Sequence, residues 1–151
     1  MSGNAKFSLL ALTFLFLFSS VVFGDDFQDG VDAYKRKDYK TAYKLFLPLA
    51  EQGDAIAQYN LGLMYSNGQG VPQDYKEAVR WYRLSAEQGN AQAQFFLGEM
   101  YEKGEGVLQD YALAHMWWNI CSSNGDANCK RGRKQVETKM TPQQIEKAQQ
   151  L

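Results

Sequence analysis

Few residues of this 151-residue chain stand in arrangements that could carry out catalysis. The single histidine, His115, falls within an expected helix, where we interpret it as a packed or surface residue. The sequence has no His-Glu-x-x-His motif, no Gly-rich phosphate loop with a Lys, and no Ser-x-x-Lys pair. Glu87, Glu99 and Glu102 have no spacing that makes them an acid–base pair. We therefore predict that the chain is not an enzyme and needs no cofactor.

Cys121 and Cys129 lie eight residues apart on either side of an expected turn, SSNGDAN. One stands at the end of a helix and the other at the start of the next, so both side chains can face inward. Two interpretations are open: a disulfide, or two small buried side chains like Ser85 and Ala93, which stand 36 positions earlier. Two thiols without a neighbouring histidine fall short of a four-ligand zinc site, so we predict no metal.

The elements that position these residues form a repeat. Residues 52–75 read QGDAIAQYNLGLMYSNGQGVPQDY and residues 88–111 read QGNAQAQFFLGEMYEKGEGVLQDY, with 15 of 24 positions identical at an offset of 36. A fixed period of this length indicates a solenoid, because one helix pair cannot bury its apolar face alone. We predict a repeat domain over 25–151, with about two and a half units: 27–52, 53–88, 89–124 and a partial unit, 125–139.

Each unit is expected to contain two helices. In the first, Ala57, Leu61, Met64 and Tyr65 share one face, and their counterparts 36 residues later do the same. In the second helix, large aromatic residues alternate with small ones, which allows neighbouring helices to pack closely without voids. Its residues are Ala78, Trp81, Tyr82, Ser85 and Ala86, and then Ala114, Trp117, Trp118 and Cys121.

Glycines are expected to end these helices, and Asp or Asn side chains to begin them. The glycines after second helices are Gly53, Gly89 and Gly125, and those in the loop between helices are Gly68, Gly70, Gly104 and Gly106. The expected N-caps are Asp54, Asp74, Asn90, Asp110 and Asp126.

The pattern A-x-A-Q-x-x-L-G-x-M-Y-x-x-G-x-G-V-x-Q-D-Y, followed by A-x-x-W-Y or A-x-x-W-W, resembles the Sel-one-like repeat family, a relative of tetratricopeptide repeats. The resemblance implies an all-α, right-handed superhelical solenoid of antiparallel helix pairs, whose concave face holds a partner protein or peptide. Two places depart from the pattern. Residues 34–39 (YKRKDY) lack the Gly-rich insertion, and Arg133-Lys134 stand where Leu-Gly is expected.

The cysteine spacing is similar to that of the cysteine-rich branch of this family, in which such a pair links adjacent helices. The resemblance thus implies a disulfide between Cys121 and Cys129. Some relatives in that branch have been linked to β-lactam binding or hydrolysis, so the alternative function is a cell-wall-related hydrolase of the β-lactamase-like kind. Without a Ser-x-x-Lys pair, the serine mechanism has no visible residues in this chain.

A candidate binding surface emerges where the two full units differ. The differing positions recur at i, i+4, i+7 and i+11 on the first helix, and so lie on one face. Such a face does not carry the packing, which leaves solvent or a ligand as its neighbour. Alternatively, the face is only exposed, with Leu63 and Phe96 covered by the adjacent unit. These candidate partner-binding residues, called the variable stripe, are Ile56, Asn60, Leu63, Asn67, Gln92, Phe96, Glu99 and Lys103.

The end of the chain has a different character. The basic run at 130–134, KRGRK, lacks interleaved aromatic residues, so we predict a solvated outer face. Thr141 is a good N-cap, Pro142 suits the first helical position, and Gln144 completes a capping box. Residues 141–151 are therefore expected to form a capping helix.

Residues 1–24 are interpreted as a cleavable signal peptide. Lys6 precedes the apolar run LLALTFLFLF, and Val22-Phe23-Gly24 suits a signal peptidase. We expect cleavage after Gly24 and a periplasmic or secreted protein. A permanent anchor is the alternative, but the apolar stretch 7–23 has only 17 residues and is interrupted by polar ones, at the low end of what spans a bilayer.

The charge balance excludes some partners. A net charge of −1 at pH 7 does not favour nucleic acid or an anionic membrane surface. We therefore predict a monomeric, non-enzymatic interaction module that binds a protein or peptide.

Overall fold

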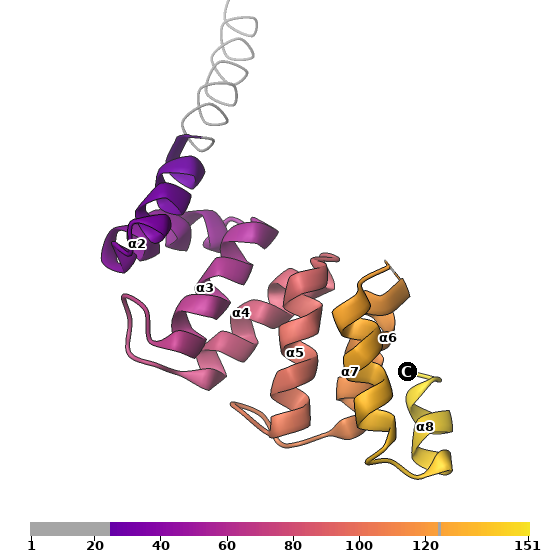
Figure 1. Cartoon of the computed structure of the whole chain (residues 1–151). Coiled ribbons are helices and arrows are strands. Elements are labelled where there is room, and N and C mark those ends of the chain that lie inside the picture. The colour runs from indigo at the N-terminus through magenta and orange to yellow at the C-terminus, as the bar shows by residue number, and fades with distance from the viewer. Residues whose placement is uncertain (1–24, 124) are drawn as a thin grey trace, which may run out of the picture.

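The computed structural model describes residues 25–123 and 125–151. Within these ranges all regular secondary structure is helical, and Figure 1 shows the helices following one another from the indigo end to the yellow end. The predicted all-α solenoid is confirmed. None of the helices in the described ranges is long and apolar enough to cross a membrane. The predicted signal peptide, residues 1–24, lies outside the described residues.

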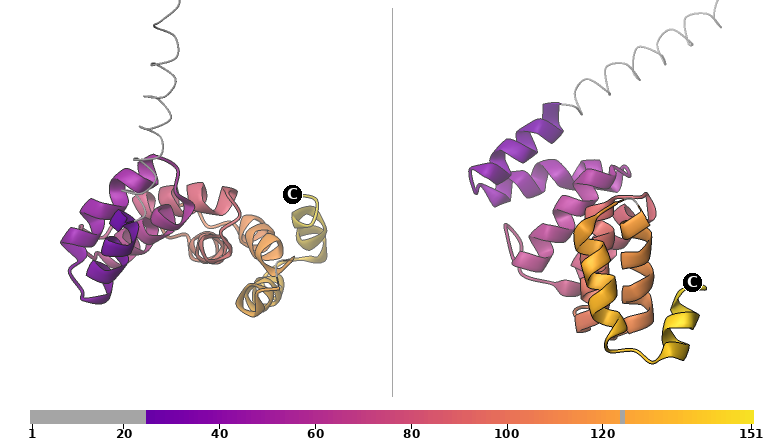
Figure 2. Two further views of the ribbon diagram at one scale, coloured as in Figure 1. Left: turned by 90° about the horizontal axis from the view of Figure 1, so that it is seen from above. Right: turned by 45° about the vertical axis from the view of Figure 1, so that its right-hand side comes forward.

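The helices pack in consecutive pairs. Residues 25–35 form a helix that pairs with α2 (Tyr39–Glu51), followed by α3 (Ala55–Asn67) with α4 (Tyr75–Glu87) and α5 (Ala91–Lys103) with α6 (Tyr111–Ser123). The first pair is joined by a short turn at 36–38, in keeping with the missing insertion. Next come α7 (Ala127–Glu137) and α8 (Pro142–Ala148), which packs against α6. Figure 2 shows α8 at the end of the stack opposite residues 25–35.

The predicted caps position the helix ends. At each expected N-cap the side-chain oxygen accepts a hydrogen bond from a backbone N–H two or three residues later: Asp54, Asp74, Asn90, Asp110 and Asp126. After each second helix a glycine adopts the left-handed conformation that stops it: Gly53 (φ 100°), Gly89 (φ 92°) and Gly125 (φ 89°). Thr141 and Gln144 form the predicted capping box.

The Gly-rich loop is a contact between consecutive units. Gly70, with φ 75°, lies against the carbonyl oxygen of Tyr39, and a Cβ there would come within 2.5 Å of that oxygen. Gly106 lies in the same way against the carbonyl oxygen of Tyr75. Each loop therefore rests on the start of the preceding unit's second helix. A larger residue would push the units apart.

The core is built from glycines and aromatic rings that face each other within one pair. Gly62 packs on Tyr82 and Gly98 packs on Trp118, so closely that an added Cβ would lie 2.5 Å and 2.6 Å from the ring atoms. Leu61 and Leu97 are fully buried in equivalent positions. Trp81 is buried, whereas its counterpart Trp117 is only partly buried.

The unexpected residues Arg133 and Lys134 have a structural reason. They occupy the α7 positions that correspond to Leu97 and Gly98, which face α6 in the preceding unit. No second helix covers this face of α7 in the described part of the chain, so Lys134 is exposed. Arg133 instead donates from Nη1 to Oδ1 of Asn119, at 2.7 Å.

Gly62→Ala should lower the free energy of unfolding by about 1–3 kcal/mol, because the new methyl group meets the Tyr82 ring in a packed core. Helix propensity alone predicts the opposite, a gain of about 1 kcal/mol. Urea denaturation measures the difference. Gln92→Ala, at an exposed position, is the control and should change stability by less than about 0.5 kcal/mol. A more stable Gly62→Ala variant would contradict this account of the core.

Candidate binding groove

The first helices of consecutive pairs form the inner side of the stack. α3 contacts α5 and α5 contacts α7, whereas α4 and α6 have no equally close contact. A stack whose rows approach more closely on one side curves toward that side. Figure 1 shows α3, α5 and α7 succeeding one another across the molecule. All eight residues of the variable stripe lie on α3 and α5, and hence on the helices of the inner side.

The variable stripe is divided between surface and packing. Its exposed members are Ile56, Asn67, Gln92 and Lys103, and its half-buried members are Asn60, Leu63, Phe96 and Glu99. Asn60 is engaged within its own helix, where its Nδ2 donates to the carbonyl oxygen of Ile56 at 2.9 Å. The exposed members are therefore those that a partner reaches without rearranging the fold.

Phe96 packs between units. Its ring stacks on Tyr82 of α4, with centroids 5.4 Å apart and planes 9° apart, and also contacts Tyr59 at 6.1 Å. Leu63 packs against the same core. The adjacent unit thus covers part of the Phe96 ring, which was the alternative interpretation of this residue.

A groove of about 260 Å³ opens between α5 and α7. It brings Glu99 and Lys103 of the variable stripe together with residues that the sequence analysis did not assign to a binding surface. These are Phe95 and Glu102 of α5, Trp118 of α6, and Asn128, Arg131, Gly132 and Gln135 of α7. Asn128, Gly132 and Gln135 stand 36 residues after Gln92, Phe96 and Glu99. If the 36-residue offset had been extended to the partial unit, these three residues would have been predicted as part of the variable stripe.

Gly132 shapes the floor of the groove. At the preceding interface Phe96 stacks on Tyr82, whereas here glycine replaces phenylalanine and the larger Trp118 replaces tyrosine. A Cβ on Gly132 would lie 2.7 Å from Cε2 of Trp118, so α7 presses directly on the indole. Nε1 of Trp118 donates to the carbonyl oxygen of Phe95 at 3.1 Å. The floor is therefore a fixed ring, 2% exposed, rather than an open stacking platform.

The two carboxylates of the groove each have a lysine nearby. Glu102 accepts hydrogen bonds from Nζ of Lys139 at 2.8 Å and from Nε2 of Gln135 at 3.3 Å. The bond to Glu102 is the main cause of a raised pKa for Lys139. Nζ of Lys103 lies 3.9 Å from Oε1 of Glu99.

Glu99 is the less well stabilised of the two carboxylates. Partial burial raises its pKa, the positive charge of Lys103 opposes that rise, and the negative charges of Glu102 and Glu105 add to it. The wall of the groove thus holds a carboxylate that is only partly compensated, beside one whose Oε1 accepts two hydrogen bonds.

A family model described as Sel1 repeat matches residues 27–54, 55–90 and 91–126. This chain belongs to the Sel1 repeat family. Sel1 repeats generally act as protein-interaction modules. No curated protein matches this chain.

Solved Sel1-type structures resemble the fold. A protective antigen present in uropathogenic Escherichia coli strains, displaying an SLR fold, has a TM-score of 0.80 and 33% identity, and the match covers 84% of this chain and 28% of that one. A Sel1 repeat protein from Oxalobacter formigenes has a TM-score of 0.68 and 33% identity, covering 71% of this chain and 44% of that one. This chain spans less than half the length of either. Neither the family model nor these structures indicate a hydrolase.

His115 lies outside the groove, between two helices of the Sel1 stack. Its side chain is buried, and its Nε2 lies 2.9 Å from Oε1 of Glu137. Two repeat lengths earlier, the hydroxyl groups of Tyr43 and Tyr65 meet at 3.0 Å in the corresponding places. The histidine is therefore one version of a polar contact between a second helix and the following first helix. This role fits the packed residue expected from the sequence.

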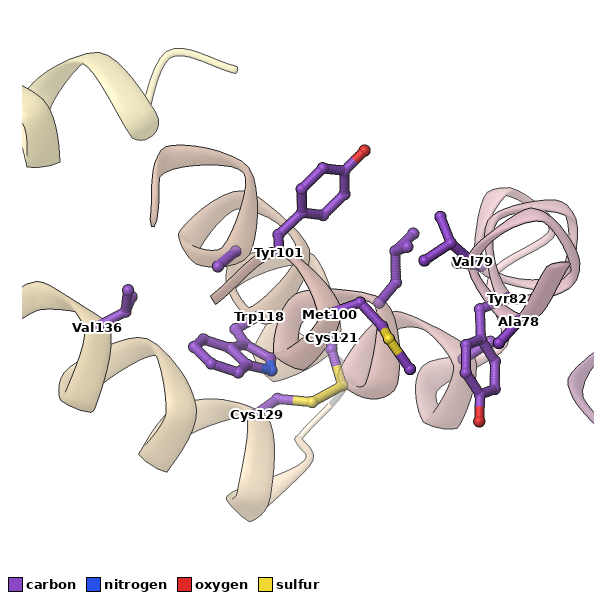
Figure 3. Packing of buried hydrophobic residues seen from close by; sticks show 13 residues of the cluster. Ala78, Val79, Tyr82, Met100, Tyr101, Trp118, Cys121, Cys129 and Val136 are labelled. Atoms are coloured by element: carbon purple, nitrogen blue, oxygen red, sulfur yellow. A yellow bond between two sulfur atoms is a disulfide. The ribbon is translucent and has the colours of Figure 1, made fainter. Parts of the chain in front are cut away.

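Cys121 and Cys129 form a disulfide that joins the end of α6 to the start of α7, with Cα atoms 5.8 Å apart. Both residues are fully buried, and Figure 3 shows the bond beside Trp118. Sγ of Cys121 contacts the carbonyl oxygen of Ala91, at the place where Ser85 donates to Ala55 in the preceding unit. Cys121 thus also keeps the packing role of the small residue it replaces.

The two sulfur atoms and the Asp126 carboxylate lie within 4.8 Å of one another, close enough to share a metal ion. However, the sulfur atoms are bonded to each other, and the carboxylate accepts hydrogen bonds from the backbone N–H groups of Asn128 and Cys129. This cluster is better explained as a disulfide beside a helix cap than as a metal site.

Replacing both cysteines, as Cys121→Ala with Cys129→Ala, should lower the free energy of unfolding by about 2.5 kcal/mol, because the closure of a loop of about nine residues is lost. Urea denaturation measures this loss. Dithiothreitol should reduce the stability of the wild type by a similar amount and leave the double variant unchanged. Equal stability of the oxidised wild type and the variant would contradict the prediction.

Proposed function

We propose that this chain is a monomeric, non-enzymatic protein-binding module that takes a segment of a partner protein along the inner side of its first helices. The observation that carries this proposal is the groove between α5 and α7. There, Glu99 and Lys103 of the variable stripe meet the residues of α7 that continue the stripe by one period. A face that differs from unit to unit and ends in a groove is suited to recognition.

The groove suits a chain segment rather than a folded surface. A volume of about 260 Å³ admits one or two side chains. Phe95 offers apolar surface on one wall. Asn128 on the other wall has a carboxamide, which can both donate to and accept from a peptide backbone. The exposed Gln92 and Lys103 extend the same contact along α5.

The lining residues also support a role without chemistry. Among the described residues that line the groove there is no Ser, Thr, Cys or His that could act as a nucleophile or a base. Glu102 is hydrogen-bonded to Lys139, and Glu99 has Lys103 beside it. Carboxylates whose negative charge is balanced by a nearby lysine are suited to a structural role in the walls of the groove.

Substituting three exposed residues of the variable stripe, as Ile56→Asp, Gln92→Arg and Lys103→Glu, should weaken peptide binding at least about tenfold, because contact and charge complementarity are lost together. The ligands are peptides selected from a displayed library on the immobilised wild-type chain. Fluorescence anisotropy with the labelled peptides measures their affinity for each variant.

The control carries the same kinds of substitution on exposed positions of second helices: Leu84→Asp, Thr41→Arg and Lys76→Glu. It changes the net charge equally and should bind the selected peptides like the wild type. Circular dichroism should show that both triple variants are folded. Equal affinity of the stripe variant and the control would place binding elsewhere and refute the proposed site.

We also propose that the chain is exported and that its signal peptide is removed after Gly24. The support is the apolar run at 9–18 followed by small residues, as in a signal peptide. Intact-mass spectrometry of the protein from an exporting bacterial host should show a chain that begins at Asp25. A chain that keeps residues 1–24 would contradict cleavage, and residence in the membrane fraction would then favour an anchor.

A further inference from the structure

The outward face of α7 carries positive charge that the fold does not use. Lys130, Arg131 and Lys134 are exposed, and none of them forms an ion pair with another described residue. By contrast, Arg133 approaches Glu137 at 3.7 Å, and Lys139 reaches Glu102 at 2.8 Å. The basic run thus separates into cations engaged in packing and cations that face solvent.

The three solvent-facing cations lie on one side of the helix. At about 100° per residue, they span roughly a third of its circumference, opposite the fully buried Cys129 and Val136. Arg131 stands at the edge of this face and also lines the groove. Its guanidinium group forms no hydrogen bond or ion pair with another described residue.

Both carboxylates of the groove have a lysine of this chain nearby. Glu102 has Lys139 and Gln135, and Glu99 has Lys103 on its own helix. Among the charged residues that line the groove, only Arg131 has no partner of opposite charge among the described residues. A guanidinium group binds a carboxylate through two parallel hydrogen bonds, which supplies direction as well as charge. Lys130 and Lys134 on the same face would attract an acidic segment as it approaches.

Building on the proposed function, we propose that the segment bound between α5 and α7 is an acidic stretch of a partner protein, and that Arg131 holds one of its carboxylates. The segment lies along the groove, with an apolar residue against Phe95 and its acidic residues toward α7.

A nucleic acid fits this site less well. A strand carries one negative charge at every nucleotide, so it cannot place an uncharged residue beside Glu99 and Glu102 as a peptide can. Sequence-tolerant strand binding also needs exposed aromatic rings, whereas Trp118 is 2% exposed and covered by Gly132. A second copy of the chain offers acidic residues at Asp25, Asp26, Asp29 and Asp32, but these stand on a folded helix, whereas the groove admits only one or two side chains of a segment.

The test uses the peptides selected on the wild-type chain. Their sequences should be enriched in Asp and Glu, and Arg131→Glu should weaken their binding about tenfold or more. Arg131→Lys should recover only part of the affinity, because a lysine lacks the two-pronged geometry. Raising the salt from about 50 to about 300 mM should weaken wild-type binding more than that of Arg131→Glu. Lys76→Glu, on the exposed surface of α4, is the charge-matched control and should bind like the wild type.

The outcomes separate the two proposals. Peptides that depend on the variable stripe but are neutral or basic, or that bind Arg131→Glu as well as the wild type, would overturn the acidic assignment and leave the proposed function intact. The absence of stripe-dependent peptides would overturn both. Self-association, or retention of a single-stranded oligonucleotide, that Arg131→Glu abolishes would assign Arg131 to a second copy or to nucleic acid, and would also overturn the acidic assignment.

Discussion

The close approach of the two helices in each pair depends on a glycine that faces an aromatic ring. Gly62 on Tyr82 and Gly98 on Trp118 bring the helix axes so near that no methyl group fits between them. With this spacing, Leu61 and Leu97 are fully buried between the helices of their pairs. A looser contact in any pair would change the curvature of the stack and the width of the groove.

Most of the fold could be predicted because the same caps, glycines and apolar positions occur in two consecutive units. The caps at Asp54 and Asn90 and the left-handed Gly53 and Gly89 follow from local backbone chemistry, which depends little on the rest of the chain. The helical faces follow from spacing alone. In such a chain, the local backbone preferences agree with the tertiary packing, so the fold of a repeat can be predicted from its sequence.

The candidate site was less predictable because it depends on the repeat being broken. The exchange of Phe96 and Tyr82 for Gly132 and Trp118 is a matched change in volume on two helices, visible only when both are seen in contact. The stacking of Phe96 on Tyr82 is equally non-local. In the sequence, Arg133 and Lys134 only depart from the repeat pattern. The structure gives the reason, because no helix covers this face of α7 among the described residues.

The disulfide has a consequence for how the last part of the stack opens. Among the described residues, α7 has no second helix of its own unit behind it, and elements with few packed neighbours open at a low free energy. Here its first turn is covalently attached to α6, while its last turn and the second residue beyond it are held by the His115–Glu137 and Glu102–Lys139 contacts. Fraying is therefore opposed at both ends. One wall of the groove is thus held in place without a covering second helix among the described residues.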